Sequence, residues 1–184
     1  GGRAGAARAV ARASNHAGGD TTGRVGMDDL AKGLESDGYK IYDLKRNGGW
    51  GVGRPYASNG VERLPDPLHG RSHGATAFQV SRFYYLLETG QLVSAEASKR
   101  MKAIMGSPEI HHKFVAGLEA AHPGSALFRK SGTWRNYHAD SAIIERDGRR
   151  YIAVARSDDP RGGDWFKGLT GGRGDNGYGN GGMT

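Results

Sequence analysis

Four consecutive residues, Lys130-Ser131-Gly132-Thr133, have side chains suited to holding an anionic acyl group. The lysine supplies a compact positive charge, and each hydroxyl can donate and accept a hydrogen bond. The glycine lets a ligand approach the backbone without meeting a Cβ atom. The stretch is therefore a candidate carboxylate-binding site, although the same residue types also make an ordinary polar turn. The elements around it must decide between these interpretations.

The segments after this motif are typical of a β-hairpin. Residues 138–145 and 150–155 contain β-branched runs, and Asp147-Gly148 lies between them. An Asp-Gly pair suits the two central positions of a type I′ turn, which both need positive φ. We therefore expect the motif to lie on one strand of a three-stranded antiparallel unit.

The residues before the motif carry helix signals. Thr76 and Ser94 can each cap a helix that a glycine ends. A Ser-Pro-Glu sequence at residues 107–109 predicts a third helix that ends near Leu118, because proline is well tolerated at the first helical position. The sequence thus predicts an α+β fold in which an antiparallel sheet packs against a helical layer, with a cleft beside the motif.

The motif and its setting resemble those of the penicillin-recognising serine hydrolases, the class A β-lactamases and D,D-peptidases. Lys130-Ser131-Gly132-Thr133 is similar to their Lys-Thr/Ser-Gly motif. The likeness extends over residues 75–160. Three stretches are similar to those of a bacterial subgroup of β-lactamase-like serine hydrolases: residues 74–77, 111–115 and 129–136. The resemblance implies a partial β-lactamase/D,D-peptidase-like fold, of which this chain holds the C-terminal part.

By this resemblance, Lys130 holds the substrate carboxylate and tunes a proton relay, which makes it the candidate catalytic residue. Ser131, Gly132 and Thr133 bind the substrate, and the Thr133 backbone N–H forms half of an oxyanion hole. Asn15 falls where the asparagine of the family's Ser-x-Asn motif binds the substrate amide. The serine of that motif is replaced by alanine at position 13, which removes the family's proton shuttle.

Three further residues are weaker candidates. Ser14 could supply the missing hydroxyl after a shift by one position, or it could cap a helix together with its neighbour. Asp66 precedes a proline where class A enzymes have the glutamate that activates the deacylating water, or it starts a turn. His138 follows the motif strand near the expected cleft and could contact substrate, or it lies at the surface.

The family's nucleophile has no counterpart in these 184 residues. It is the serine of a Ser-x-x-Lys motif, and no serine of this chain has a lysine three residues later. The resemblance places that motif before residue 1, in a missing N-terminal segment or a second chain, so this chain alone is expected to be inactive.

Three functions therefore stay open. The first is a serine hydrolase that opens β-lactams or D-Ala-type amides through an acyl-enzyme, with a role in antibiotic resistance. The second is a non-catalytic peptidoglycan-binding or β-lactam-binding relative, and the third is a basic, glycine-rich binding protein. The resemblance implies a periplasmic or secreted location, although the sequence shows no signal peptide.

The composition of the chain argues against several other classes of function. The chain has 36% apolar residues, no cysteine and a net charge of +7. Disulfide and thiolate chemistry are excluded, and the histidines lack the spacing of a metal site, so we predict no metal and no cofactor. The basic residues form no nucleic-acid-binding motif, and no apolar run is long enough for a membrane span. The expected partner is a small β-lactam or peptidoglycan-type substrate.

Residues 1–168 are predicted to form a single partial β-lactamase-like domain. Residues 169–184 are rich in glycine and poor in apolar side chains, which predicts a disordered tail. Residues 158–166 resemble the start of the family's terminal helix, but such a tail could continue that helix only at a heavy entropic cost. One face of the sheet is therefore expected to be uncovered or covered by another chain.

Overall fold

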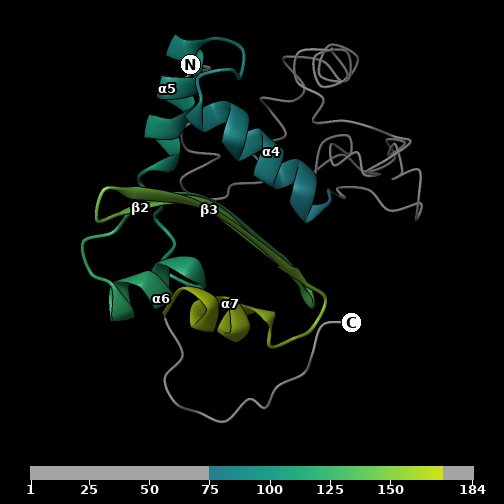
Figure 1. The fold of residues 1–184 in the computed structure, drawn as a ribbon. Helices are drawn as coiled ribbons and strands as arrows, with labels where there is room; N and C mark the ends of the chain where they lie inside the picture. Colours follow the sequence, from purple (N-terminus) through teal and green to yellow (C-terminus); the bar gives the residue numbers. More distant parts are fainter. Residues whose placement is uncertain (1–74, 172–184) are drawn as a thin grey trace, which may run out of the picture.

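The computed structural model describes residues 75–171 as a sheet between two helical layers (Figure 1). The elements follow in the order α4 (Ala77–Glu88), α5 (Ala95–Met105), α6 (Phe114–Ala121), β1 (Ala126–Trp134), β2 (Tyr137–Arg146), β3 (Arg149–Ser157) and α7 (Gly162–Gly171). Helices α4 and α5 lie on one face of the sheet, and α6 and α7 lie on the other. The predicted α+β fold, an antiparallel sheet packed against helices, is confirmed.

The sheet has the strand order β1-β2-β3, so β1 is an edge strand within residues 75–171. Both pairs of neighbouring strands are antiparallel, and the register places Lys130 opposite Ser141. The turn between β2 and β3 has φ values of 51° at Asp147 and 72° at Gly148, as the Asp-Gly signal predicts. The three-stranded unit is thus confirmed.

Helices α4 and α5 begin at the predicted caps. The Thr76 hydroxyl accepts a hydrogen bond from the Gln79 N–H at 3.2 Å, and the Ser94 hydroxyl accepts one from the Ala97 N–H at 3.1 Å. The buried apolar side chains of this layer pack against Ile143 of β2, which is fully buried. They are Tyr84, Leu86, Leu87, Leu92 and Met105. This packing fixes α4 and α5 against the first face of the sheet.

Helices α6 and α7 cover the second face, so the expectation of an uncovered face is wrong. Phe114 of α6 and Phe166 of α7 are almost fully buried there, with ring centroids 6.1 Å apart. Gly117 lets the two helices touch, because a Cβ atom at this position would overlap the Lys167 carbonyl and the Thr170 hydroxyl. Helix α7 has only ten residues, and it completes this layer by packing directly against the backbone of α6 at Gly117.

The last helix also runs past the predicted end of the domain. The sequence places that end at residue 168, whereas α7 continues to Gly171. Thr170 secures the final turn, because its hydroxyl donates a hydrogen bond to the Phe114 carbonyl at 3.1 Å. Residues 1–74 and 172–184 lie outside the described residues, so the single domain and the glycine-rich tail otherwise stay predictions.

Residues 107–113, which we call the connector, are not helical, although Ser-Pro-Glu at 107–109 predicts a helix there. Helix α6 begins only at Phe114. The reason is a tertiary contact, because the Arg129 guanidinium donates hydrogen bonds to the carbonyls of Ile110 at 2.7 Å and His112 at 3.1 Å. A helix over these residues would need the Ile110 carbonyl for its own hydrogen bonds, whereas the His112 carbonyl also accepts the Val115 N–H at 3.2 Å. The predicted beginning of the third helix is therefore wrong.

Candidate carboxylate-binding site

The motif residues lie at the end of β1, on the edge of the sheet. Successive side chains of a strand point to opposite faces. Lys130 therefore lies on the face covered by α4 and α5, whereas Ser131 and Thr133 lie on the face of the connector and α6. Because β1 is an edge strand within the part of the chain that the structure describes, side chains on its two faces can meet one ligand at its outer edge. The sequence alone did not separate the two faces.

Lys130 is half-buried, and its ammonium donates a hydrogen bond to the Ser131 carbonyl. Burial lowers the pKa of Lys130, the charge of Arg129 lowers it further, and Asp140 opposes both effects. A lysine with a lowered pKa releases its proton more readily than a solvated one. This property suits a group in a proton relay.

A buried tyrosine of α4 fixes the backbone at Lys130. The Tyr84 hydroxyl donates a hydrogen bond to the Ser141 carbonyl at 2.8 Å. The Ser141 hydroxyl in turn donates one to the Lys130 carbonyl at 3.0 Å. Burial raises the pKa of Tyr84, so its hydroxyl stays protonated at neutral pH. The helical layer thus positions the motif strand through a chain of two hydrogen bonds.

A buried ion pair lies beside the motif on the opposite face. Arg129 and Asp140 are 3% and 1% exposed, and Nε and Nη2 of the arginine each donate to a carboxylate oxygen at 2.8 Å. The carboxylate also accepts the backbone N–H groups of Phe114 at 3.1 Å and Ser141 at 3.0 Å. Each carboxylate oxygen thus accepts two hydrogen bonds. A buried ion pair is tolerated in a protein interior when its charges are paired and hydrogen-bonded in this way. It joins β1 to β2 and to the start of α6.

Lys113, the last residue of the connector, contacts the motif from the face of the sheet that α6 and α7 cover. Its side chain is 4% exposed in the fold, and its ammonium donates three hydrogen bonds. The acceptors are the Gly132 carbonyl at 2.7 Å, the Thr133 hydroxyl at 2.8 Å and the Ala139 carbonyl at 3.1 Å. Burial lowers the pKa of Lys113 to about 8, an effect that neighbouring cations increase and a neighbouring carboxylate opposes. The connector therefore contributes a cation to the candidate site.

His112 completes the surroundings of the motif. Its Nε2 atom lies 3.3 Å from the Ser131 hydroxyl oxygen. Burial lowers the pKa of His112, and two nearby cations lower it further, so the imidazole is neutral at pH 7. Three cations therefore lie at this end of β1, namely Lys113, Arg129 and Lys130, and the carboxylate that opposes the lowered pKa of the two lysines is that of Asp140. The surplus positive charge favours an anionic ligand at this end of β1.

The structure brings the four motif residues together at the strand end, but their exposure differs. Ser131 is 8% exposed and faces His112, whereas Gly132 and Thr133 are exposed. Thr133 is thus better placed than Ser131 to meet a ligand from solvent.

His138 lies opposite Thr133 in the register of β1 and β2. It is half-buried, and its ring packs against Gly162 and Gly163 at the start of α7. Its Nδ1 atom is buried and has no hydrogen-bond partner. A role in substrate binding stays a prediction. The other predicted site residues, Ser14, Asn15 and Asp66, lie outside the described residues, and their roles also stay predictions.

Sequence reasoning missed the charged residues that support the motif: Lys113, Arg129 and Asp140. A weak signal exists for two of them. Asp140 interrupts a strand whose following residues are small or apolar, and Lys113 directly precedes an apolar run. A charge in a buried strand needs a partner. The sequence does not say which of the many arginines and lysines supplies it.

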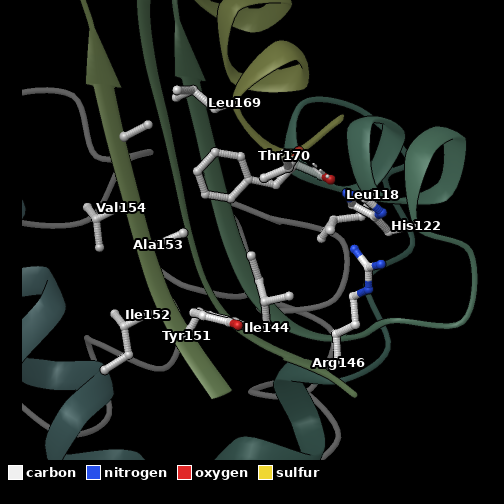
Figure 2. Close-up of a pocket in the computed structure, with 12 residues that line it drawn as sticks. Leu118, His122, Ile144, Arg146, Tyr151, Ile152, Ala153, Val154, Leu169 and Thr170 are labelled. Carbon is white, nitrogen blue, oxygen red and sulfur yellow. Dashed lines mark hydrogen bonds between the residues drawn. The ribbon is translucent and has the colours of Figure 1, made fainter. Parts of the chain in front are cut away.

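A hollow of about 490 Å³ lies away from the motif, on the side of α6 and α7 near the β2–β3 turn (Figure 2). Figure 2 shows Leu118, Leu169 and Tyr151 around it, with Arg146 and His122 as its basic members. No carboxylate and no motif residue lines this hollow, which is mostly apolar. It therefore lacks the convergent polar groups of an active site, and the candidate site remains at the end of β1.

Within residues 75–171, no helix has the length and apolar character needed to cross a membrane. No group of three or more His, Cys, Asp or Glu side chains in the same range could hold a metal ion.

The antiparallel sheet with helices on both faces is a β-lactamase-like fold. Residues 20–170 match the model of the Beta-lactamase enzyme family. This match covers most of the chain, and the chain therefore belongs to the β-lactamase enzyme family, with a class A β-lactamase-like fold. The resemblance seen in the sequence is confirmed.

Solved structures with a similar fold include PBP-A, a PBP-A mutant in an acyl-enzyme complex with penicillin G, and a β-lactamase from Sphaerobacter thermophilus. Each is 16% identical and covers 92% of this chain, with TM-scores of 0.66, 0.69 and 0.66. The chain spans 58%, 59% and 60% of their respective lengths. At this identity, the likeness establishes the fold. No curated protein matches the chain.

Proposed function

We propose that this chain carries the carboxylate-binding half of a β-lactamase-type serine hydrolase. The proposed substrates are β-lactams or D-Ala-type amides, which both carry a carboxylate close to the bond that is cleaved. Membership of the β-lactamase enzyme family supports this class of reaction. A structural neighbour that forms an acyl-enzyme with penicillin G supports the class of substrate.

The observation that carries the proposal is the surplus positive charge at the outer end of β1. Lys130 is half-buried there, Thr133 is exposed, and Lys113 and Arg129 lie behind them. Two opposite charges 4 Å apart near a protein surface attract each other by about 4 kcal/mol. Such an attraction, in a geometry that the surrounding bonds already fix, suits the capture of a carboxylate.

In this proposal the motif residues have separate roles. The Lys130 ammonium attracts the substrate carboxylate and exchanges protons with the reacting groups, and the Thr133 hydroxyl donates a hydrogen bond to that carboxylate. The Thr133 backbone N–H donates to the oxyanion that forms on the attacked carbonyl. Loss of one oxyanion donor typically lowers kcat about a hundredfold or more. Asn15 binds the substrate's side-chain amide in this scheme.

The nucleophile comes from outside residues 1–184 in this proposal, because no serine within them starts a Ser-x-x-Lys motif. That serine attacks the amide carbonyl, and water later releases the acyl group. The family likeness also supports a periplasmic or secreted location. A second candidate is a relative that binds β-lactams or peptidoglycan without cleaving them, a role that the same carboxylate-binding residues could serve.

Penicillin G and a chromogenic cephalosporin distinguish these functions. Hydrolysis of the cephalosporin, or a mass increase equal to one penicillin G, supports the hydrolase when the chain is assayed together with a segment or second chain that supplies the Ser-x-x-Lys serine. Saturable binding of penicillin G that gives no mass increase even when that serine is supplied supports the non-catalytic relative. If none of these occurs, both proposals are refuted, and a basic, glycine-rich binding protein remains.

Substitutions at Lys130 test the site itself. Lys130→Met should weaken penicillin G binding about tenfold or more, because methionine has a side chain of similar length but no charged hydrogen-bond donor. Lys130→Arg should weaken it less, because the positive charge remains. The control is Lys99→Met, which makes the same change at an exposed lysine of α5. Equal effects at positions 99 and 130 would contradict the proposed site.

A further inference from the structure

Lys113 occupies a backbone position that suits glycine better than lysine. Its φ of 52° and ψ of −121° lie in a region that residues with a Cβ atom rarely adopt. Its side chain makes no capping hydrogen bond to α6, although the residue lies at the N-cap of that helix. The Lys113 side chain is therefore almost fully buried at a position where it stabilises neither the backbone conformation nor the start of α6.

All three N–H donors of the Lys113 ammonium bind oxygens of β1 and β2 beside the motif. A lysine has three N–H donors, and here each has an oxygen within 3.1 Å. Two of these oxygens are the carbonyls of Gly132 and Ala139, which lie opposite each other on β1 and β2. The third is the Thr133 hydroxyl, at 2.8 Å. All three acceptors are neutral, so the charge of Lys113 is not cancelled by direct contact with a carboxylate.

The bond to Thr133 determines where the threonine proton can point. A hydroxyl has one proton and two lone pairs. Because Lys113 donates to the oxygen, the proton of Thr133 cannot point toward the lysine and is free for an acceptor outside the protein. Thr133 is exposed, so a ligand at the outer edge of β1 can provide that acceptor. The bound cation also makes the hydroxyl a stronger donor.

We propose that Lys113 is a positioning residue of the carboxylate site, which orients the Thr133 hydroxyl as a hydrogen-bond donor toward the ligand. The inference rests on the proposed function, since it takes the ligand to be the carboxylate of a β-lactam or D-Ala-type substrate. Lys113 acts through Thr133 and does not contact the ligand itself. Loss of its proton would weaken the donor without removing the threonine.

The surroundings of Lys113 place this loss of charge above neutral pH. The groups that face it are Phe166 of α7, whose ring centroid lies 5.9 Å from the ammonium, and the charged or titratable residues His112, Arg129, Lys130 and Asp140. Burial and the two cations lower the pKa of Lys113 to about 8, against the opposing effect of the carboxylate. Binding should therefore weaken as the pH rises through this range.

The experiment compares penicillin G binding by the 184-residue chain and its variants between pH 6 and about 9.5. Lys113→Met removes the charge, Lys113→Arg keeps a permanent charge, and Thr133→Val removes the hydroxyl. At pH 6 to 7, Lys113→Met should weaken binding about tenfold, the typical effect of one charge-assisted hydrogen bond. The double variant Lys113→Met/Thr133→Val should bind no more weakly than Thr133→Val alone, because both changes act on one hydrogen bond.

The pH profile separates positioning from a merely structural role. In the unmodified chain the affinity should fall through about pH 8, and in Lys113→Arg this fall should disappear. A fall that persists in Lys113→Arg would assign it to Lys130 and overturn the inference. Additive losses in the double variant would overturn it as well. Lys113→Met could fail to fold, and in that case the arginine variant and Thr133→Val still decide the question.

A measurement without ligand keeps this inference separate from the proposed function. NMR signals of the Thr133 and Gly132 amides should shift with pH as Lys113 titrates, and the shift should be absent in Lys113→Arg. If the shift occurs but penicillin G never binds, the proposed function fails while the link between Lys113 and the motif stands. If penicillin G binds but the shift is missing, only the role of Lys113 is overturned.

Discussion

Replacing Asp140 with asparagine tests whether the buried ion pair holds the motif strand in place. The change keeps the size of the side chain and removes its charge. Each carboxylate oxygen accepts two hydrogen bonds, one from Arg129 and one from a backbone N–H. Whichever way the asparagine amide is turned, its NH2 group meets two donors. Asp140→Asn therefore loses two of four hydrogen bonds and leaves the arginine charge uncompensated.

The expected cost is about 3–5 kcal/mol of the free energy of unfolding, the usual effect of breaking one partner of a buried ion pair. For a chain of this length, the melting temperature should fall by roughly 6–20 °C. Urea titration of the 184-residue chain, followed by circular dichroism, measures the free energy of unfolding.

Asp147→Asn is the matched control. The Asp147 side chain is 78% exposed in the hairpin turn, and its φ of 51° suits asparagine. This variant should change the free energy of unfolding by less than about 0.5 kcal/mol. The double variant Arg129→Met/Asp140→Asn should be more stable than Asp140→Asn alone, because it also removes the uncompensated cation. If Asp140→Asn costs no more than Asp147→Asn, the role given to the ion pair is refuted.

Other contacts can be tested by matched substitutions in urea titrations. Tyr84→Phe removes a buried hydrogen bond and should cost about 1–2 kcal/mol. Tyr85→Phe, at an exposed position of the same helix, should cost almost nothing, and equal losses would contradict the role of the buried hydroxyl. Gly117→Ala forces α6 and α7 apart and should cost about 1–3 kcal/mol or more, whereas Gly168→Ala, with open space around its Cβ position, should stabilise α7 by up to about 1 kcal/mol. Burial lowers the pKa of Lys113 from 10.5 to about 8, so the unfolded chain binds more protons between these pH values. The contribution of Lys113 to the free energy of unfolding should therefore rise over this range, and a fall relative to Lys113→Met would contradict the assigned environment.

Much of the fold could be predicted from the sequence because its signals are local. The Asp147-Gly148 pair specifies its turn through backbone sterics alone, and Thr76 and Ser94 specify helix beginnings through their own hydroxyls. The third helix shows where such signals fail. Its Ser-Pro-Glu start is a valid local signal, but Arg129, distant in sequence, binds the Ile110 carbonyl that an earlier turn of the helix would need.

The candidate site could be predicted only in part for a similar reason. The motif is a continuous string, so its residue types and its strand were readable. Lys113 and Asp140 join it through the register of β1 with β2 and the path of the connector, which no local pattern encodes. The division of the motif side chains between two faces of the sheet follows from strand alternation. The surroundings of each side chain could not be predicted, because they depend on which helices cover each face of the sheet (Figure 1).

The contacts of Arg129 have a consequence for the order in which the chain folds. Arg129 bonds to carbonyls 17 and 19 residues before it and to a carboxylate 11 residues after it. The contact with the carboxylate forms within the β1–β2 hairpin, whereas the two contacts with the connector close further loops against chain entropy and form after the hairpin. A folding intermediate of this chain would therefore have its secondary structure but no assembled receptor for acids. Ligand capture should consequently appear later during refolding than the β1–β2 hairpin.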